Sequence, residues 1–287
     1  MSACQIPLKK GINLGRVSGI KSLPPFPAVA CKLLGIISDD NANFREVSRL
    51  LMTDSALSGQ VLRVANSALF GFRREVSSIL QALCLVGANR VRDVVVTVAL
   101  KNYMGDGDKA SFRTCWRHNL ATALWGENLA KIYRLEGAIS YTAGLLHDLG
   151  RIVLLMLLPD DYSSFLEDSS TSDLDWRDAE RDLFDFDHCQ VGHYLSRVWD
   201  FQPILSDVIG YHHDETTPAT PRAQMLVRAA CVAASMSGFH TVGPARKWEP
   251  EKIVSLLPPC NNGAQPPMDY LLQKVVDELN LIECGLL

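Results

Sequence analysis

The sequence predicts an all-α protein, and three observations support this fold class. Apolar residues recur at steps of three and four positions along most of the chain, which is the spacing of one helix face. The alternation of apolar and polar residues that is typical of strands is nearly absent. Prolines, short polar residues and glycines fall where such helices would begin and end.

Several helices are expected in the first third of the chain. The first follows the proline-rich stretch Leu23–Pro27, because proline is favoured at the start of a helix. Asn43 is suited to cap the second helix, and either Asp54 or Ser55 the third. Gly87 is expected to end the fourth. The expected helices cover residues 29–37, 44–51, 55–65, 78–86 and 89–103, with a turn over 66–71.

The clearest linker is Gly105-Asp106-Gly107-Asp108, and it predicts a division into two helical lobes. Residues 1–18 are then an N-terminal extension, 19–104 an N-terminal helical bundle, and 109–287 a second bundle with C-terminal helices. A helix over 138–158 is apolar nearly all round, so we expect it inside the second bundle, with Pro159 ending it. The other expected helices cover 113–134, 173–183, 187–199, 203–213, 221–236, 250–257 and 268–282.

Composition excludes several classes of protein. Of the 287 residues, 47% are hydrophobic and 21% charged, which is typical of a globular protein. The formal net charge of −4 does not favour a dedicated nucleic-acid binder. The 8 cysteines form no CxxC pair and are expected to be thiols in a reducing compartment. The apolar run 152–158 is far shorter than the roughly 20 residues of a membrane span, so a cytoplasmic protein without a membrane partner is expected.

A spread-out set of histidines is the candidate site. His147 and Asp148 are adjacent within an otherwise apolar segment, where a buried ionisable pair is costly unless it is paired or binds a metal. From one helix, such a pair can address one metal or two. The remaining candidates lie on other predicted helices, so the ligands would meet in a bundle core; they are His118, His188, His212 and His213.

Other interpretations of the same residues remain open. His147 and Asp148 can form a buried hydrogen-bonded pair that only orients helices. The pair His212 and His213 ends a predicted helix and can stabilise its negative end, and the sequence does not decide which of the two faces the site. His193 and His240 are assigned no function.

The order of these residues resembles the HD superfamily of metal-dependent phosphohydrolases. The N-terminal half resembles the HDOD branch, and the resemblance extends from about residue 19 to 236. It is carried by Leu23–Ala28, Thr53–Leu57, Asn66-Ser67-Ala68-Leu69-Phe70-Gly71, Phe186-Asp187-His188 and Tyr211-His212-His213. The resemblance implies an HD-like second bundle. It also implies a pocket for a divalent transition metal (Fe, Mn, Zn or Ni), or an HD-type pocket that has lost its metal.

Two departures from the HD pattern bear on activity. Cys231 stands where HD phosphohydrolases carry a late aspartate, and a thiolate is a poor substitute for a carboxylate on Mg²⁺ or Mn²⁺. The Gly-Tyr-Pro signature of cyclic-di-GMP hydrolases is missing after His213, and Arg151 replaces a lysine that is frequent in that branch. Arg151 could face a phosphate.

The resemblance therefore predicts a bacterial signal-transduction output protein with a degenerate, non-catalytic pocket. One alternative is a working phosphodiesterase that acts on a nucleotide or phosphate ester. Another is a nucleotide-binding sensor without turnover. Receiver, kinase or cyclase-type signalling proteins are the expected partners, homodimerisation is an option, and nucleic acid is not expected.

Overall fold

The structure is a computed structural model, and it describes residues 19, 23–36, 43–105, 110–135, 137–168, 176–243, 246–259 and 266–286. Throughout these residues the regular structure is helical, without a strand. The predicted all-α class is therefore confirmed. No helix within these ranges combines the length and apolar character needed to cross a membrane.

The first helices follow the predicted caps. The side chain of Asp54 accepts a hydrogen bond from the Leu57 backbone N–H, which settles the choice between Asp54 and Ser55. Asn43 and Ser78 cap their helices in the same way. Gly87 has a φ of 90°, a conformation that favours glycine, between two helices. The helices are α1 (Ala28–Ile36), α2 (Phe44–Leu51), α3 (Ser55–Ala65), α4 (Ile79–Val86) and α5 (Ala88–Met104).

The later helices differ from the prediction in two places. The expected helix over 138–158 is two helices, because the chain turns at His147 and Asp148. Pro159 does not only end a helix: it begins a further one that the sequence analysis missed, in the first position that proline favours. The helices are α6 (Ala110–Tyr133), α7 (Gly137–Leu146), α8 (Leu149–Leu157), α9 (Pro159–Asp168), α10 (Trp176–Phe184), α11 (His188–Val198), α12 (Pro203–Tyr211), α13 (Arg222–Met236), α14 (Pro250–Leu256) and α15 (Met268–Leu286).

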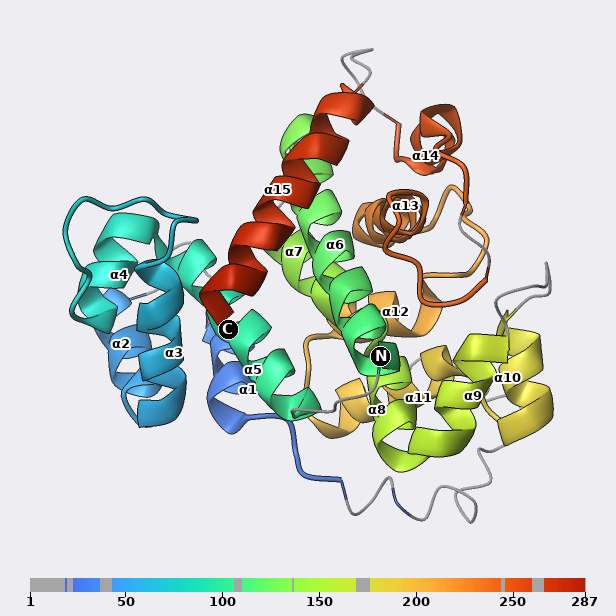
Figure 1. The fold of residues 1–287 in the computed structure, drawn as a ribbon, viewed down its shortest axis with the longest axis horizontal. Helices are drawn as coiled ribbons and strands as arrows, with labels where there is room; N and C mark the ends of the chain where they lie inside the picture. Colours follow the sequence, from blue (N-terminus) through green and yellow to red (C-terminus); the bar gives the residue numbers. More distant parts are fainter. Residues whose placement is uncertain are drawn as a thin grey trace, which may run out of the picture.

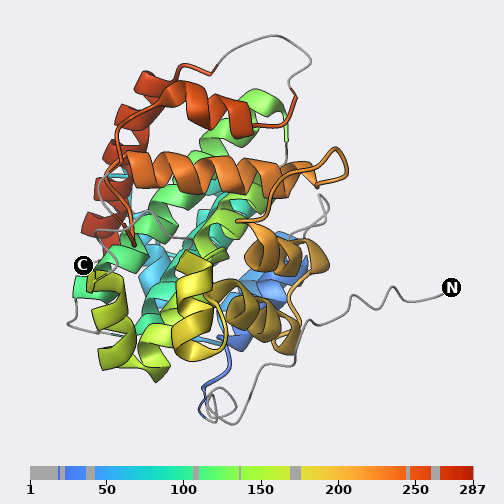
Figure 2. The same cartoon turned by 90° about the vertical axis from the view of Figure 1, so that its right-hand side faces the viewer.

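The long helix α6 is the centre of the arrangement. It packs against α7, α13 and α15, and α15 runs beside it in Figure 1. Figure 2 shows α13 crossing the same group of helices, with α11 and α12 near one of its ends. The C-terminal helix α15 also packs against α3, and α5 packs against α7. Beyond Gly105 the predicted linker lies outside the described residues, so the division into lobes stays a prediction.

A buried ionic group lies where α5 meets α6 and α7. Arg92 and Asp93 are both buried, and the Arg92 guanidinium lies 2.9 Å from a carboxylate oxygen of Asp93. Burial raises the pKa of Asp93 to about 7, although the charge of Arg92 acts in the opposite direction. The folded protein therefore holds a proton on Asp93 over a pH range in which the unfolded chain has released it.

Asp93 should make the stability fall as the pH rises. Because the pKa of Asp93 is raised in the folded protein, its contribution to the free energy of unfolding is fully present below about pH 3.9, the pKa of Asp in the unfolded chain. This contribution is lost as the pH rises through about 7, the pKa in the folded protein. The slope from this one group is at most about 1.4 kcal/mol per pH unit. Denaturant unfolding between pH 5 and pH 8 is expected to show a smaller decrease for Asp93→Asn than for the wild type. The exposed control Asp277→Asn should keep the wild-type slope, and an unchanged slope in Asp93→Asn would contradict the assignment.

Candidate metal centre

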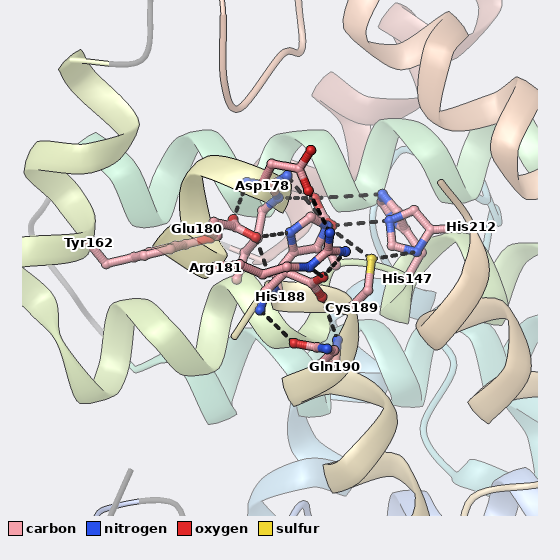
Figure 3. A network of polar contacts seen from close by, with 12 residues as sticks. His147, Tyr162, Asp178, Glu180, Arg181, His188, Cys189, Gln190 and His212 are labelled. Atoms are coloured by element: carbon pink, nitrogen blue, oxygen red, sulfur yellow. Dashed lines mark hydrogen bonds and ion pairs between the residues drawn. The ribbon is translucent and has the colours of Figure 1, made fainter. Parts of the chain in front are cut away.

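All the predicted site residues meet in one place, although they come from five parts of the chain. His118 lies midway along α6, and His147 and Asp148 occupy the turn between α7 and α8. His188 is the first residue of α11, whereas His212 and His213 follow α12 directly. His213 is half-buried, and the others are buried: His118, His147, Asp148, Arg151, His188, His212 and Cys231. Figure 3 shows the side chains of His147, His188 and His212 converging.

The turn at His147 and Asp148 is what aims both side chains at the site. The prediction that one continuous helix carries the pair is wrong. The break separates α7 from α8. In the first turn of α8, the backbone N–H of Arg151 donates a hydrogen bond of 2.9 Å to the carbonyl oxygen of Asp148. Glycines at positions 144 and 150 flank the turn and weaken helix propensity there.

Two of the histidines have their outer nitrogens fixed by backbone carbonyls. The Nδ1 atom of His118 lies 2.6 Å from the Phe239 carbonyl oxygen, and Nδ1 of His147 lies 2.7 Å from that of Gly144. A carbonyl oxygen only accepts hydrogen bonds, so each Nδ1 must carry the hydrogen. In the neutral ring the Nε2 atom is then an unprotonated lone-pair donor, as a metal ligand requires.

The same arrangement recurs at the other two inner histidines. Nδ1 of His212 lies 3.1 Å from the Ile209 carbonyl oxygen, and Nδ1 of His188 lies 2.6 Å from a carboxylate oxygen of Glu180. Their Nε2 atoms are directed toward Asp148, each 3.4 Å from its Oδ1. Four imidazole lone pairs therefore face one carboxylate.

The inner ring nitrogens and Oδ1 of Asp148 are acceptors that face one another. The Nε2 atoms of His118 and His147 lie only 3.2 Å apart, yet in their neutral forms neither has a hydrogen to give the other. Within the described residues, Oδ1 of Asp148 and Nε2 of His212 are buried without a hydrogen-bond partner. Buried polar atoms are almost always satisfied, so the site fits a cation that would bind these atoms.

The spacing of the ligand atoms suits a transition metal. Two nitrogens bound to tetrahedral zinc lie about 3.3 Å apart, and a nitrogen and a sulfur about 3.6 Å apart. The observed values are 3.2 Å between Nε2 of His118 and Nε2 of His147, and 3.6 Å between Nε2 of His118 and Sγ of Cys231. The groups that can hold an ion are His118, His147 and Cys231; His147, Asp148 and His212; and His188, Cys189, His212 and His213.

Electrostatics keep these groups in ligand form. Burial lowers the pKa of His118 to about 4, and it also lowers the pKa values of His147, His212 and His213, so the rings are neutral at neutral pH. Burial alone would raise the pKa of Asp148, but the charge of Arg151 holds it well below its usual range. The carboxylate is therefore charged. Cys231 differs, because burial raises the pKa of its thiol to about 12.

Buried polar residues next to the histidines also support the centre. The main one, Glu180 of α10, was not among the residues predicted from the sequence. Glu180 is fully buried and accepts hydrogen bonds from the Tyr162 hydroxyl at 2.6 Å and from the His188 backbone N–H at 2.9 Å. Figure 3 shows Tyr162, Glu180 and His188 joined in this network. The sequence offered little indication of this role for Glu180. The residue lies in a strongly charged segment, and nothing distinguishes it there from the neighbouring acidic residues.

Arg151 is held by this network. Its guanidinium donates to Asp148 over 2.9 Å and to Glu180 over 3.2 Å. Two buried carboxylates therefore balance its charge, although it still lines the cavity next to the histidines. Cys189 was also missed: its Sγ lies 3.3 Å from Nε2 of His188.

The position of His188 depends on a cap and on a close helix crossing. The Asp187 side chain accepts from the Gln190 N–H, and the Gln190 side chain accepts from the Asp187 N–H, which together form a capping box at the start of α11. Gly150 of α8 lies directly against the His188 backbone carbonyl and Gly192. Only a residue without a Cβ atom permits this approach.

The fold and this centre define an HD-like helical protein with a buried His/Asp site. The family model of the HDOD domain matches residues 23–215. The chain belongs to the HDOD domain family.

Proteins of similar fold carry names from two functional classes. One, named "Putative phosphohydrolase", from Shewanella amazonensis SB2B, is 21% identical, with a TM-score of 0.70 over 96% of this chain and 100% of its own. Another, named "Putative signal transduction protein", from Marinobacter aquaeolei VT8, is 19% identical, with a TM-score of 0.70 over 96% of this chain and 66% of its own. An uncharacterised protein of Treponema pallidum (strain Nichols) is 23% identical over 197 residues, which cover 68% of this chain. The matched stretch covers only 38% of that relative's own length. Identities this low indicate a shared fold.

Proposed function

We propose that the protein is a signal-transduction output module whose HD-type pocket holds a divalent transition metal without hydrolysing a phosphate ester. In this proposal residues 19–104 form one helical lobe and 109–287 the HD-like lobe. The signalling name of the Marinobacter protein supports this context. Receiver, kinase or cyclase-type proteins would be the partners, and the module would work in the cytoplasm, alone or as a homodimer.

The observation that carries the non-catalytic part is Cys231. Its thiol completes the donor group of His118 and His147, in the place of the late aspartate of HD phosphohydrolases. A buried thiol with a pKa raised to about 12 gives up its proton only to a metal that binds sulfur well. A carboxylate would instead serve the harder cations. Cys231 therefore favours tight, structural metal binding.

Each residue has a role in this proposal. His118, His147, Asp148, His188 and His212 would hold the metal, and His213 would lie at the edge of the centre. Glu180 orients His188, and Arg151 keeps Asp148 charged. A metal in an HD site supplies Lewis acidity and an activated water when the site is catalytic. Here the thiol of Cys231 would take a ligand position, and it reduces the room for such a water.

A phosphohydrolase is the second candidate, and the assembled donor set favours it. Most HD-type ligands are present and preorganised, and the Shewanella protein bears a phosphohydrolase name. The two candidates differ in turnover, so an assay separates them.

Changing the thiol to a carboxylate tests the proposal. The protein is loaded with Mn²⁺, and hydrolysis of bis(p-nitrophenyl) phosphate is followed. The wild type should show no turnover above that of His147→Ala, whereas Cys231→Asp should gain turnover that His147→Ala abolishes in the double variant. Cys231→Ser, which has no carboxylate, is the matched control and should stay inactive. Turnover by the wild type that is lost in His147→Ala would replace the proposal with the phosphohydrolase.

A further inference from the structure

A cavity of about 360 Å³ opens beside the histidines, and its wall is rich in basic residues. Five basic side chains line it, together with Asp148 as the one carboxylate among its described lining residues. The chain as a whole has a formal net charge of −4, so this positive lining is a local feature. The basic residues are Arg151, Arg177, Arg228, Arg246 and Lys252.

Two of these charges are already balanced. Arg151 is paired with Asp148 and Glu180, and a guanidinium nitrogen of Arg177 lies 2.6 Å from a carboxylate oxygen of Asp214. Neither leaves a full positive charge to attract a ligand.

Within the part of the chain that the structure describes, no carboxylate pairs with the other three charges. The guanidinium of Arg228 donates to the main-chain carbonyl of Asp214, which carries no net charge. Among the described residues, no ion pair is formed by Arg228, Arg246 or Lys252. Arg228 is half-buried on α13, and the other two are exposed at the cavity. Like charges gathered around one cavity repel each other unless an anion lies between them.

We infer that Arg228, Arg246 and Lys252 form a binding site for the phosphate groups of an organic phosphate of about mononucleotide size. Guanidinium groups bind phosphate through charge-assisted hydrogen bonds, which are about twice as strong as neutral ones. All three residues lie beyond residue 215, where the HDOD match ends. The site is thus a property of the C-terminal part of this chain.

The remaining lining indicates the organic part of the ligand. Trp176, Val232, Val242 and Leu256 give the same cavity apolar surface, which free phosphate would not use. A volume of about 360 Å³ lies at the lower end of the roughly 300–1,000 Å³ range of small-molecule pockets. A mononucleotide has both parts that this lining fits, an anionic phosphate and a flat apolar base.

The inference rests on the proposed function, because a non-catalytic pocket would keep such a ligand as a signal. It does not depend on the metal, since none of the three basic residues belongs to the candidate metal groups. Binding can therefore be measured on protein treated with a chelator.

Calorimetric titration of the chelator-treated full chain with ADP tests the site. ADP should bind the wild type, and the double variant Arg228→Gln/Arg246→Gln should bind it on the order of 10–100-fold more weakly, because charge-assisted contacts are lost. The control Arg45→Gln/Arg49→Gln removes the same charge from exposed positions on α2 and should bind ADP like the wild type. Equal weakening in both double variants would reduce the effect to non-specific charge and overturn the site.

Two fragments of ADP identify which part is recognised. Pyrophosphate and adenosine should each bind more weakly than ADP, and only the affinity for pyrophosphate and ADP should fall with rising salt. Adenosine binding as tightly as ADP would contradict the phosphate site, as would a wild type that binds none of the three. The metal content of the same preparation is measured separately. A negative ADP titration would therefore contradict the phosphate site without contradicting the proposed metal centre.

Discussion

Gly150→Ala is expected to destabilise the protein by about 3 kcal/mol or more. A Cβ atom at this position would overlap the His188 carbonyl oxygen and lie 2.7 Å from its carbonyl carbon and 2.9 Å from the Gly192 backbone nitrogen. All of these are backbone atoms, which cannot move aside as a flexible side chain can. The two helices would have to separate, and overpacking of this kind is among the few mechanisms with large effects.

Equilibrium denaturation measures this effect, and Gly59→Ala is the matched control. Gly59 lies on the exposed face of α3, and an added Cβ there meets open space. The control should gain about 0.5–1 kcal/mol from better helix propensity. If Gly150→Ala were as stable as the wild type, the close crossing of α8 and α11 would be wrong, and with it the position of His188.

Glu180→Gln is expected to weaken metal binding by about 10–100-fold and to cost about 3 kcal/mol of stability. Burial alone would raise the pKa of Glu180, but its contacts with His188 and Arg151 lower it to about 2, so it is a carboxylate at neutral pH. The glutamine has nearly the same shape but no charge. It would leave the buried Arg151 with one carboxylate partner, and one of the two oxygens that accept from Arg151 and His188 would become an NH₂ donor.

Titration of the metal-free protein with Zn²⁺, together with denaturant unfolding, tests both effects. Glu167→Gln makes the same change on the exposed side of α9 and should match the wild type in both measurements. A Glu180→Gln variant with unchanged zinc affinity would show that the hydrogen bond from His188 to Glu180 does not support the centre.

Helix positions were predictable from the sequence because their signals are local. Apolar spacing and the caps expected at Asn43 and Asp54 located the early helices within a few residues. The break at His147 was not predicted, because the apolar spacing continues across it, and the glycines at 144 and 150 weaken helix propensity without fixing where a turn falls. Pro159 was ambiguous for a similar reason, because proline both stops one helix and starts the next.

The candidate site was predictable as a set but not as a geometry. The apolar surroundings indicated His147 and Asp148, the set of histidines on other predicted helices added His118 and His188, and the structure brings them together. Which nitrogen each ring presents depends on carbonyls distant in sequence, such as that of Phe239 opposite His118. The contact between Glu180 and His188 likewise depends on how α10 packs, which no local pattern records.

The metal content of the purified full-length protein, measured together with its phosphodiesterase turnover, tests the central claim most directly. Elemental analysis of the wild type should find a transition metal bound in stoichiometric amount, lost in His147→Ala, with no turnover in the same sample. The claim that this pocket is a metal centre would be contradicted by a wild type that stays metal-free after incubation with Zn²⁺, Mn²⁺, Fe²⁺ and Ni²⁺. The claim that it is non-catalytic would be contradicted by turnover that disappears with the metal.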